Sequence, residues 1–128
     1  MEAVNLRVLL VDDEPDLLKQ GEIFLKMENE ELEVETTTSG EEAYQMVENE
    51  DFDAIISDYI LPDMDGIEIL EKLREEGDDV TFIIFTGRDS EEMEKKSLES
   101  GADKFLKKGR SPKTLYKKIV EEITASTE

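Results

Sequence analysis

Four short apolar segments of this chain each end on polar side chains that could take part in phosphoryl chemistry. Val8–Val11 is followed by Asp12 and Asp13, and Ala54–Ser57 is followed by Asp58. Two further segments lead into a hydroxyl and into ammonium groups, since Phe82–Phe85 precedes Thr86 and Phe105–Leu106 precedes Lys107 and Lys108. In an open parallel sheet the carboxyl ends of the strands share one edge, and ligands bind outside it. We therefore expect three carboxylates, one hydroxyl and one ammonium group to meet there.

Three carboxylates that lie close together repel one another unless a cation is bound among them. Mg²⁺ takes oxygen ligands, usually one or two carboxylates together with water molecules and phosphate oxygens. The set therefore predicts a metal-assisted site at which an aspartate accepts a phosphoryl group. On this basis, neutralising Asp12 or Asp13 should raise the metal-free stability and weaken metal binding.

Each of these residues also has an ordinary structural interpretation. Asp12 and Asp13 could cap a helix, because aspartate is common at helix starts. Thr86 could simply end a strand. Only one aspartate is needed as a cap, however, and Asp58 lies several residues before any predicted helix. Taken together, the residues favour a metal site.

Strand and helix patterns alternate five times along the chain, which predicts the elements that position these residues. Buried or alternating segments predict strands at Arg7–Val11, Leu32–Thr36, Ala54–Ser57, Val80–Phe85 and Lys104–Leu106. Helical spacing of apolar residues predicts helices over Pro15–Met27, after the capping boxes that begin at Ser39 and Asp89, from Ile67, and after Ser111. This alternation with short connections implies a (βα)₅ arrangement of the α/β class, with parallel strands and right-handed crossovers.

Composition excludes several kinds of chemistry. The chain has 128 residues, a net charge of −20, no cysteine and no histidine. Disulfides, thiolate nucleophiles, histidine bases and the usual zinc ligands are therefore absent. No apolar run approaches the ~20 residues that span a bilayer, and the N-terminus does not resemble a signal peptide. We expect a cytoplasmic protein with no membrane contact, and its acidity opposes direct binding of nucleic acid.

Four segments in order resemble the receiver domain of two-component response regulators, over essentially the whole chain. They are Asp12-Asp13, Ser57–Gly66, Thr86-Gly87 and Gly101–Lys108. The resemblance implies a flavodoxin-like three-layer sandwich around a five-stranded parallel sheet of order 2-1-3-4-5. It also implies a single receiver domain over residues 1–128, with its core at about 6–124. We expect a stand-alone archaeal or bacterial response regulator, because the chain ends soon after the last predicted helix.

The resemblance implies a role for each acidic residue of the site. Asp58 would be the phospho-acceptor, receiving the group from a sensor histidine kinase. Asp13, Asp58 and the backbone carbonyl of Ile60 would ligate Mg²⁺, with Mn²⁺ as a substitute, and Asp12 would act through a bound water. Such a protein would catalyse only its own phosphorylation and dephosphorylation.

The remaining implied roles belong to the switch. Lys108 would pair with Asp58 before transfer and with a phosphoryl oxygen afterwards. Thr86 would donate its hydroxyl to the phosphoryl group, after which Phe105 would change rotamer. Taken outside the family, the residue type and position of Phe105 favour a core residue over a switch.

One position departs from the family pattern. Gly109 stands after the strand-end lysine, where the family usually has proline, often with a cis bond. Because a cis bond before another residue costs ~2.5–4 kcal/mol, we expect a trans bond and a more mobile loop. The register favours Lys108, and Lys107 is the alternative.

Basic residues gather on the fourth helix, fifth strand and fifth helix, where receivers carry signal output. Residues 88–118 hold ten basic and six acidic residues, and the candidates for a positive patch are Lys95, Lys96, Lys104, Arg110, Lys113 and Lys117. The hypothesis is that an acidic downstream protein docks there, with its association rate steered by charge. The ordinary interpretation is solvated helix faces that balance nearby glutamates. A monomer or a phosphorylation-dependent dimer is expected.

Three other functions fit parts of the pattern. A magnesium-dependent phosphatase of the haloacid dehalogenase type would carry Asp-x-Asp after its first strand, whereas Asp12 and Asp13 are adjacent here. A degenerate receiver could act as a phosphate-independent docking module, although all the expected phosphorylation residues are present. A flavodoxin-like cofactor binder is disfavoured because Asp12, Asp13 and Glu14 would repel a flavin phosphate.

Overall fold

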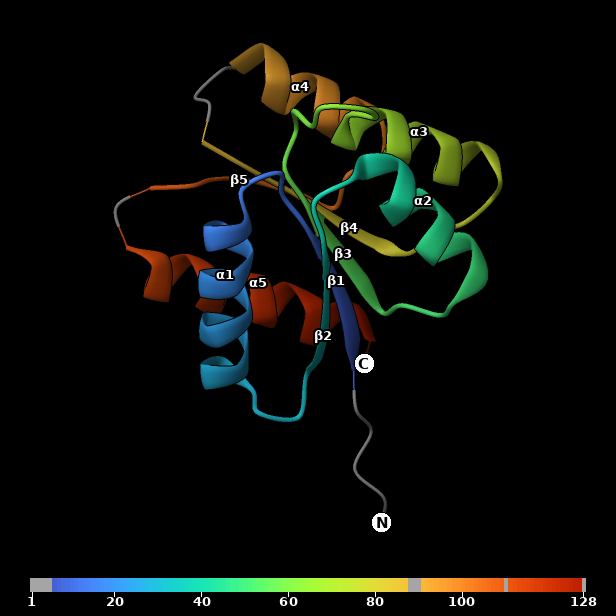
Figure 1. Cartoon of the computed structure of the whole chain (residues 1–128). Coiled ribbons are helices and arrows are strands. Elements are labelled where there is room, and N and C mark those ends of the chain that lie inside the picture. Colours follow the sequence, from blue (N-terminus) through green and yellow to red (C-terminus); the bar gives the residue numbers. More distant parts are fainter. Residues whose placement is uncertain (1–5, 88–90, 110, 128) are drawn as a thin grey trace.

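The computed structural model describes residues 6–87, 91–109 and 111–127, and in these ranges five strands and five helices alternate (Figure 1). Their bounds are β1 Arg7–Val11, α1 Pro15–Glu28, β2 Glu33–Thr37, α2 Gly40–Asn49, β3 Ala54–Ser57, α3 Gly66–Glu75, β4 Thr81–Thr86, α4 Glu91–Glu99, β5 Lys104–Lys107 and α5 Pro112–Thr127. Two sequence predictions, the capping box at Asp89 and the patch residue Arg110, lie outside the described residues.

The strands form one sheet of order β2-β1-β3-β4-β5, in which every neighbouring pair is parallel. Helices α1 and α5 cover one face of the sheet, and α2, α3 and α4 lie on the other (Figure 1). The predicted flavodoxin-like three-layer fold and its strand order are confirmed.

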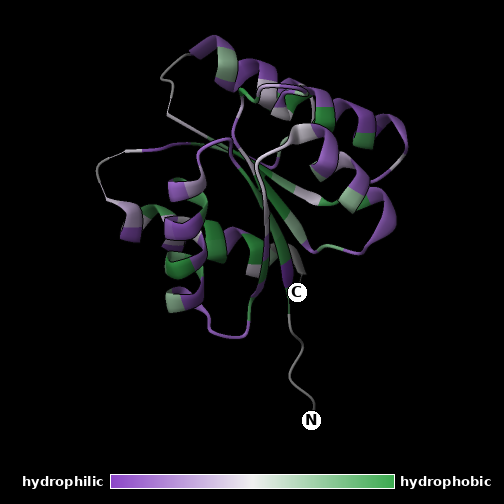
Figure 2. Ribbon diagram, viewed as in Figure 1, coloured by the Kyte–Doolittle hydropathy of each residue, from purple (hydrophilic) through white to green (hydrophobic). Residues whose placement is uncertain are grey.

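Alternation along the central strands divides the core into two layers. Residues such as Leu9, Ile55 and Ile84 pack with α2 and α3, whereas Leu10 and Ile56 pack with α1 and α5. Successive strand residues point to opposite faces, so a strand covered on both sides must be apolar throughout. Figure 2 shows this as hydrophobic colour along the central strands, between helices whose outer faces are hydrophilic.

Helix α1 buries one of its faces. The structure buries Leu18, Gly21 and Leu25, whose spacing follows the helical period. Ile23, in contrast, is 56% exposed. Ile23 therefore lies on the outer side of the helix.

The start of α2 follows its prediction only in part. The Ser39 hydroxyl accepts a hydrogen bond from the Glu42 amide at 3.1 Å, as a capping box requires. The Ser39 amide, however, donates to the Thr37 hydroxyl at 3.2 Å. Thr37 therefore supplies the acceptor that the box assigns to Glu42. In contrast, α3 has a complete capping box between Asp65 and Glu68 that the sequence analysis did not identify.

No helix in the described part of the chain combines the length and apolar character needed to cross a membrane.

Candidate functional site

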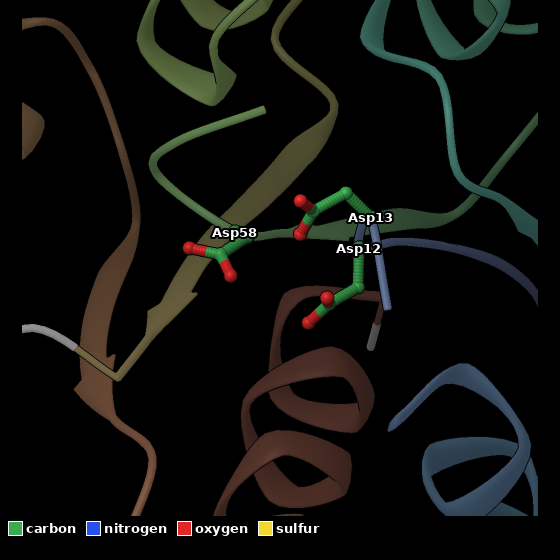
Figure 3. Close-up of side chains that lie close together, drawn as sticks. All are labelled: Asp12, Asp13 and Asp58. Atoms are coloured by element: carbon green, nitrogen blue, oxygen red, sulfur yellow. The ribbon is translucent and has the colours of Figure 1, made fainter. Parts of the chain in front are cut away.

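The three predicted acidic residues converge at the carboxyl edge of the sheet. Asp12 and Asp13 follow β1, and Asp58 follows the adjacent strand β3. The Asp58 amide donates a hydrogen bond to the Val11 carbonyl at 3.0 Å. One carboxylate oxygen from each of the three lies within 4.8 Å of the others. Figure 3 shows the three side chains extending from these two strand ends into a common space.

Strand alternation explains which lysine reaches this cluster. Lys108 lies two residues after Leu106, which packs on the α1 and α5 side of the sheet, and Asp12 and Asp58 continue that same face. Lys107 has the opposite parity and is exposed. A shift of one residue would therefore carry the ammonium group to the other face.

Both ion pairs that the structure describes in this cluster are formed by Lys108. Its Nζ donates to Asp58 Oδ2 at 2.9 Å and also to Asp12 Oδ2. The side chains are largely buried, with 20% of Lys108, 8% of Asp12 and 14% of Asp58 exposed. Burial lowers the pKa of Lys108, but hydrogen bonds to both carboxylates outweigh it, so the pKa is raised. The ammonium group is therefore fixed in its charged form.

The two adjacent acids Asp12 and Asp13 differ in their contacts. Asp12 accepts from Lys108 and, through Oδ1, from the Glu14 amide at 3.0 Å. Asp13 is exposed and makes no hydrogen bond or ion pair to any described residue. Neither side chain caps α1, whose N-cap residue is Glu14 and which lacks a side-chain cap. The structure therefore does not support the interpretation of these acids as caps.

The donor set fits a hard divalent cation. Three carboxylates face a single ammonium group, so the cluster keeps an excess of negative charge. Carboxylate oxygens are the ligands that Mg²⁺ prefers, and no nitrogen or sulfur donor competes, because the chain lacks histidine and cysteine.

The other predicted site residues line one cleft with the acids. Asp13, Asp58, Ile60, Thr86 and Lys108 all contribute to it. The Ile60 amide lies 3.4 Å from Asp58 Oδ1, and the Lys108 amide donates to the Thr86 carbonyl at 2.7 Å. The sheet therefore brings these residues together from the carboxyl ends of four strands, β1, β3, β4 and β5.

Phe105 lies apart from this cleft. Its half-buried side chain packs against the core layer on the α2 and α3 side. This contact agrees with its interpretation as a core residue, and a role as a switch stays a prediction. The expected trans bond after Lys108 is confirmed, since the described residues contain no cis peptide.

A residue that the sequence analysis passed over anchors the loop after β3. The Asp63 carboxylate accepts from the Ser39 hydroxyl at 2.7 Å, the Gly40 amide at 2.9 Å and the Glu41 amide at 3.1 Å. These hydrogen bonds, the one from Ser39 first, hold the pKa of Asp63 well below its usual range. No sequence signal pointed to this role, because the partners lie more than twenty residues away.

Close backbone contacts fix the same loop at two points. A Cβ at Gly40 would clash with the Met64 carbonyl oxygen, and one at Gly66 would clash with the Asp58 carbonyl oxygen. Asp65 Oδ1 accepts from the Leu61 amide at 3.0 Å. The segment that carries Ile60 is therefore held between α2 and α3.

Three lysines of the predicted positive patch have acidic neighbours. Lys95 lies 3.9 Å from Glu99, Lys96 lies 3.8 Å from Glu71, and Lys104 lies 3.7 Å from Glu122. These exposed pairs agree with the interpretation of solvated, balanced faces, and each is expected to contribute little to stability. The docking hypothesis stays a prediction.

Comparison with known proteins agrees with the fold and the acid cluster. The family model of the response regulator receiver domain matches residues 8–120. A receiver domain protein described as CheY-like from Methanospirillum hungatei JF-1 is 34% identical, with a TM-score of 0.85 over 97% of this chain and 98% of that one. The receiver domain of a LuxO-type repressor from Vibrio parahaemolyticus is 26% identical, with a TM-score of 0.88 over 97% of this chain and 94% of that one.

A curated relative is the response regulator SaeR of Staphylococcus aureus, 33% identical over 117 residues. These cover 91% of this chain and 50% of that protein, so the chain spans about half the length of the curated relatives it matches. Receiver domains are phosphorylation-dependent signalling switches that interact with histidine kinases and downstream effectors. This chain belongs to the family of response regulator receiver domains.

Proposed function

We propose that this chain is a two-component signalling switch in which Asp58 accepts a phosphoryl group from a sensor histidine kinase. The observation that supports the proposal most directly is the contact of Lys108 Nζ with both Asp58 and Asp12, beside the third carboxylate of Asp13. A nucleophilic carboxylate, a fixed cation and spare anionic ligands are the parts that phosphoryl transfer requires.

In the proposed reaction, a carboxylate oxygen of Asp58 attacks phosphorus as the bond between phosphorus and the kinase histidine nitrogen breaks. The electron pair of that bond stays on the imidazole, which takes a proton from solvent, and an aspartyl phosphate forms. Little covalent assistance is needed, so orientation and charge neutralisation carry the rate. Lys108 holds the Asp58 carboxylate in place before transfer.

Asp13, Asp58 and the backbone carbonyl of Ile60 are proposed to hold Mg²⁺, with Asp12 acting through a water. When bound, the ion would neutralise charge on the transferring phosphoryl oxygens. Asp63 and Asp65 keep the Ile60 segment in place through the contacts described above. The chain itself thus supplies both the ligands and the rigidity of the loop that presents them.

After transfer, the proposed switch begins with Lys108 and Thr86. The new phosphoryl oxygens compete with Asp12 for the Lys108 ammonium group. The Thr86 hydroxyl donates to one of them, which draws the end of β4 inward, and Phe105 changes rotamer in response. A local change of charge is thereby converted into a change of surface.

The proposed output surface comprises α4, β5 and α5, where an acidic downstream protein would dock. The protein is proposed to act in the cytoplasm, as a monomer or as a dimer formed on phosphorylation. A triple charge reversal of Lys95, Lys96 and Lys104 should slow association with that protein and flatten its salt dependence. As a control, reversing the charges of Lys19 and Lys26 on α1 should change neither the association rate nor its salt dependence. Equal effects of both sets would contradict the assignment of the surface.

The intact mass after incubation with acetyl phosphate and Mg²⁺ tests the proposed function. We expect one added phosphoryl group, which is absent from Asp58→Asn and from a sample with EDTA. Phosphorylation that survives Asp58→Asn would overturn the acceptor assignment. Absence of any adduct, together with no beryllofluoride complex, would overturn the switch itself.

A further inference from the structure

A cavity of about 140 Å³ lies directly behind the acid cluster, between the sheet, α1 and α5. Strand residues Leu10, Ile56 and Phe85 and helix residues Leu17 and Leu115 give it a largely apolar wall. Asp12, Asp58 and Lys108 form the wall nearest the site, and Figure 3 shows the Asp12 carboxylate directed toward α5. One side of the site is therefore apolar and hollow.

The position of the cavity is that of a ligand site. It lies between the carboxyl ends of β1 and β3, where the strand order reverses and where open α/β sheets bind ligands. Its volume limits the occupant, because drug-sized ligands occupy about 300–1,000 Å³, whereas an apolar cavity of about 150 Å³ holds benzene. A nucleotide or a flavin is excluded by size.

Tyr116 of α5 also lines the cavity. Tyr116 is 5% exposed and its ring stacks on Phe24 at 5.6 Å and meets Phe85 edge-on at 5.5 Å. Its hydroxyl lies against Gly21, where a Cβ would be 2.9 Å away. Burial raises the pKa of Tyr116 to about 12, so the hydroxyl stays protonated and can donate.

Charge further narrows the class of occupant. The nearby carboxylates oppose an anion, and Lys108 already satisfies the cation requirement of Asp12. An apolar wall gives no compensation for burying a charge. The occupant that these features fit is an uncharged ring with a single oxygen that can accept from Tyr116.

We propose that this cavity binds a small uncharged aromatic molecule of the phenol class, and that its occupancy slows phosphoryl transfer to Asp58. An occupant would exclude water beside the Lys108–Asp12 pair and lower the local dielectric, which strengthens the pair. Lys108 must leave Asp12 to reach the phosphoryl oxygens. The effect on transfer rests on the proposed function above, whereas the binding does not.

Titration of the whole chain with phenol, followed by amide chemical shifts, tests the binding. We expect saturable shifts around Leu17 and Leu115. Leu115→Phe fills the cavity and should abolish them, whereas the matched change Leu98→Phe, on the exposed side of α4, should leave them intact. If Leu115→Phe fails to fold, Leu17→Phe fills the same cavity and provides the same test. Non-saturable shifts, or saturable shifts that survive the filled cavity, would overturn the site.

Two further measurements separate the parts of the proposal. Tyr116→Phe should weaken phenol binding at least threefold and leave benzene binding unchanged; an equal loss for both ligands would overturn the role of the hydroxyl. Saturating phenol should slow phosphorylation by acetyl phosphate at least threefold in the parent chain but not in Leu115→Phe. An unchanged rate with phenol bound would overturn the coupling. If Asp58 is not phosphorylated even without phenol, the proposed function is contradicted, and the binding result is unaffected.

Discussion

Each end of the sheet places one cation among several carboxylates, but the two clusters differ in how far they are exposed to solvent. At the amino-terminal edge, Arg7 is paired with Glu33, Glu35 and Glu50 at 3.6, 3.4 and 2.9 Å. These glutamates are 44–54% exposed. At the carboxyl edge, Lys108 faces acids that are 8% and 14% exposed. The ion pairs of the first cluster are solvated, whereas those that Lys108 forms with Asp12 and Asp58 are largely buried.

The difference lies in whether the donors satisfy the acceptors. The Arg7 guanidinium spreads its donors over several partners, donates to the Asp51 carbonyl at 3.1 Å and lies 4.6 Å from the centre of the Phe52 ring. Its pKa is raised mainly by the hydrogen bond to Glu50. Water screens whatever charge remains. Lys108 has a single compact ammonium group for a cluster of three carboxylates, so negative charge remains for a further cation.

The largest effect is expected from Lys108→Met, which leaves two buried carboxylates without their cation. We expect the free energy of unfolding in EDTA to fall by about 2 kcal/mol, below the about 3–5 typical of a fully buried pair. Mg²⁺ should restore part of the loss by mass action. Urea unfolding measures both values, with Lys107→Met as the neighbouring control. Equal losses for the two lysines would contradict the assignment of Lys108.

Arg7→Met should destabilise the protein less than Lys108→Met, and its effect should depend on salt. Raising the salt from about 0.1 to 1 M shortens the Debye length from about 10 to 3 Å, which weakens exposed pairs more than buried ones. The deficit of Arg7→Met should therefore shrink with salt while that of Lys108→Met persists. Urea unfolding at both salt concentrations checks this. Equal salt dependence of the two deficits would contradict the difference between the two ends of the sheet.

Asp63→Ala removes a carboxylate near the carboxyl edge of the sheet. Neutral hydrogen-bond donors, rather than a cation, stabilise this carboxylate. Loss of this helix-capping carboxylate should cost about 1 kcal/mol. Because folding lowers the pKa of Asp63, its contribution is complete above the unfolded value of about 4 and is lost as the pH falls below it. The stability gap between parent and variant should therefore close in acid. A gap that is constant from pH 7 to pH 2 would contradict this, and Asp79→Ala serves as the exposed control.

The smallest change, and one of opposite sign, is expected from Asp13→Asn. Removing the acid that has no partner among the described residues should relieve repulsion and raise metal-free stability by about 0.5 kcal/mol. The same variant should bind Mg²⁺ at least tenfold more weakly. Asp12→Asn should instead lower metal-free stability, because it weakens the contact with Lys108. Urea unfolding with and without Mg²⁺ distinguishes them, and the same sign for both would refute the division of roles.

Asp12 and Asp13 make different contacts in the folded protein, although they are neighbours in the sequence. The sequence predicted that neutralising either Asp12 or Asp13 would raise the metal-free stability. The structure restricts this expectation to Asp13, because strand parity carries Asp12 toward Lys108. Parity also separates Lys108 from Lys107, which the pattern could only rank. The contacts of Asp63 with the start of α2 were not predicted, because these partners are far away in the sequence.

The sequence by itself determined the order of strands and helices and the chemistry at the strand ends, because periodicity and strand-end residues are local properties. It placed Asp12, Asp13, Asp58, Thr86 and Lys108 at one edge through a general rule for parallel sheets. Only the tertiary structure decided which carboxylate meets the ammonium group, how the loop carrying Ile60 is anchored and where a cavity remains beside Tyr116. Those features depend on how side chains from distant segments fill the same space, and packing of that kind leaves no periodic trace in the sequence.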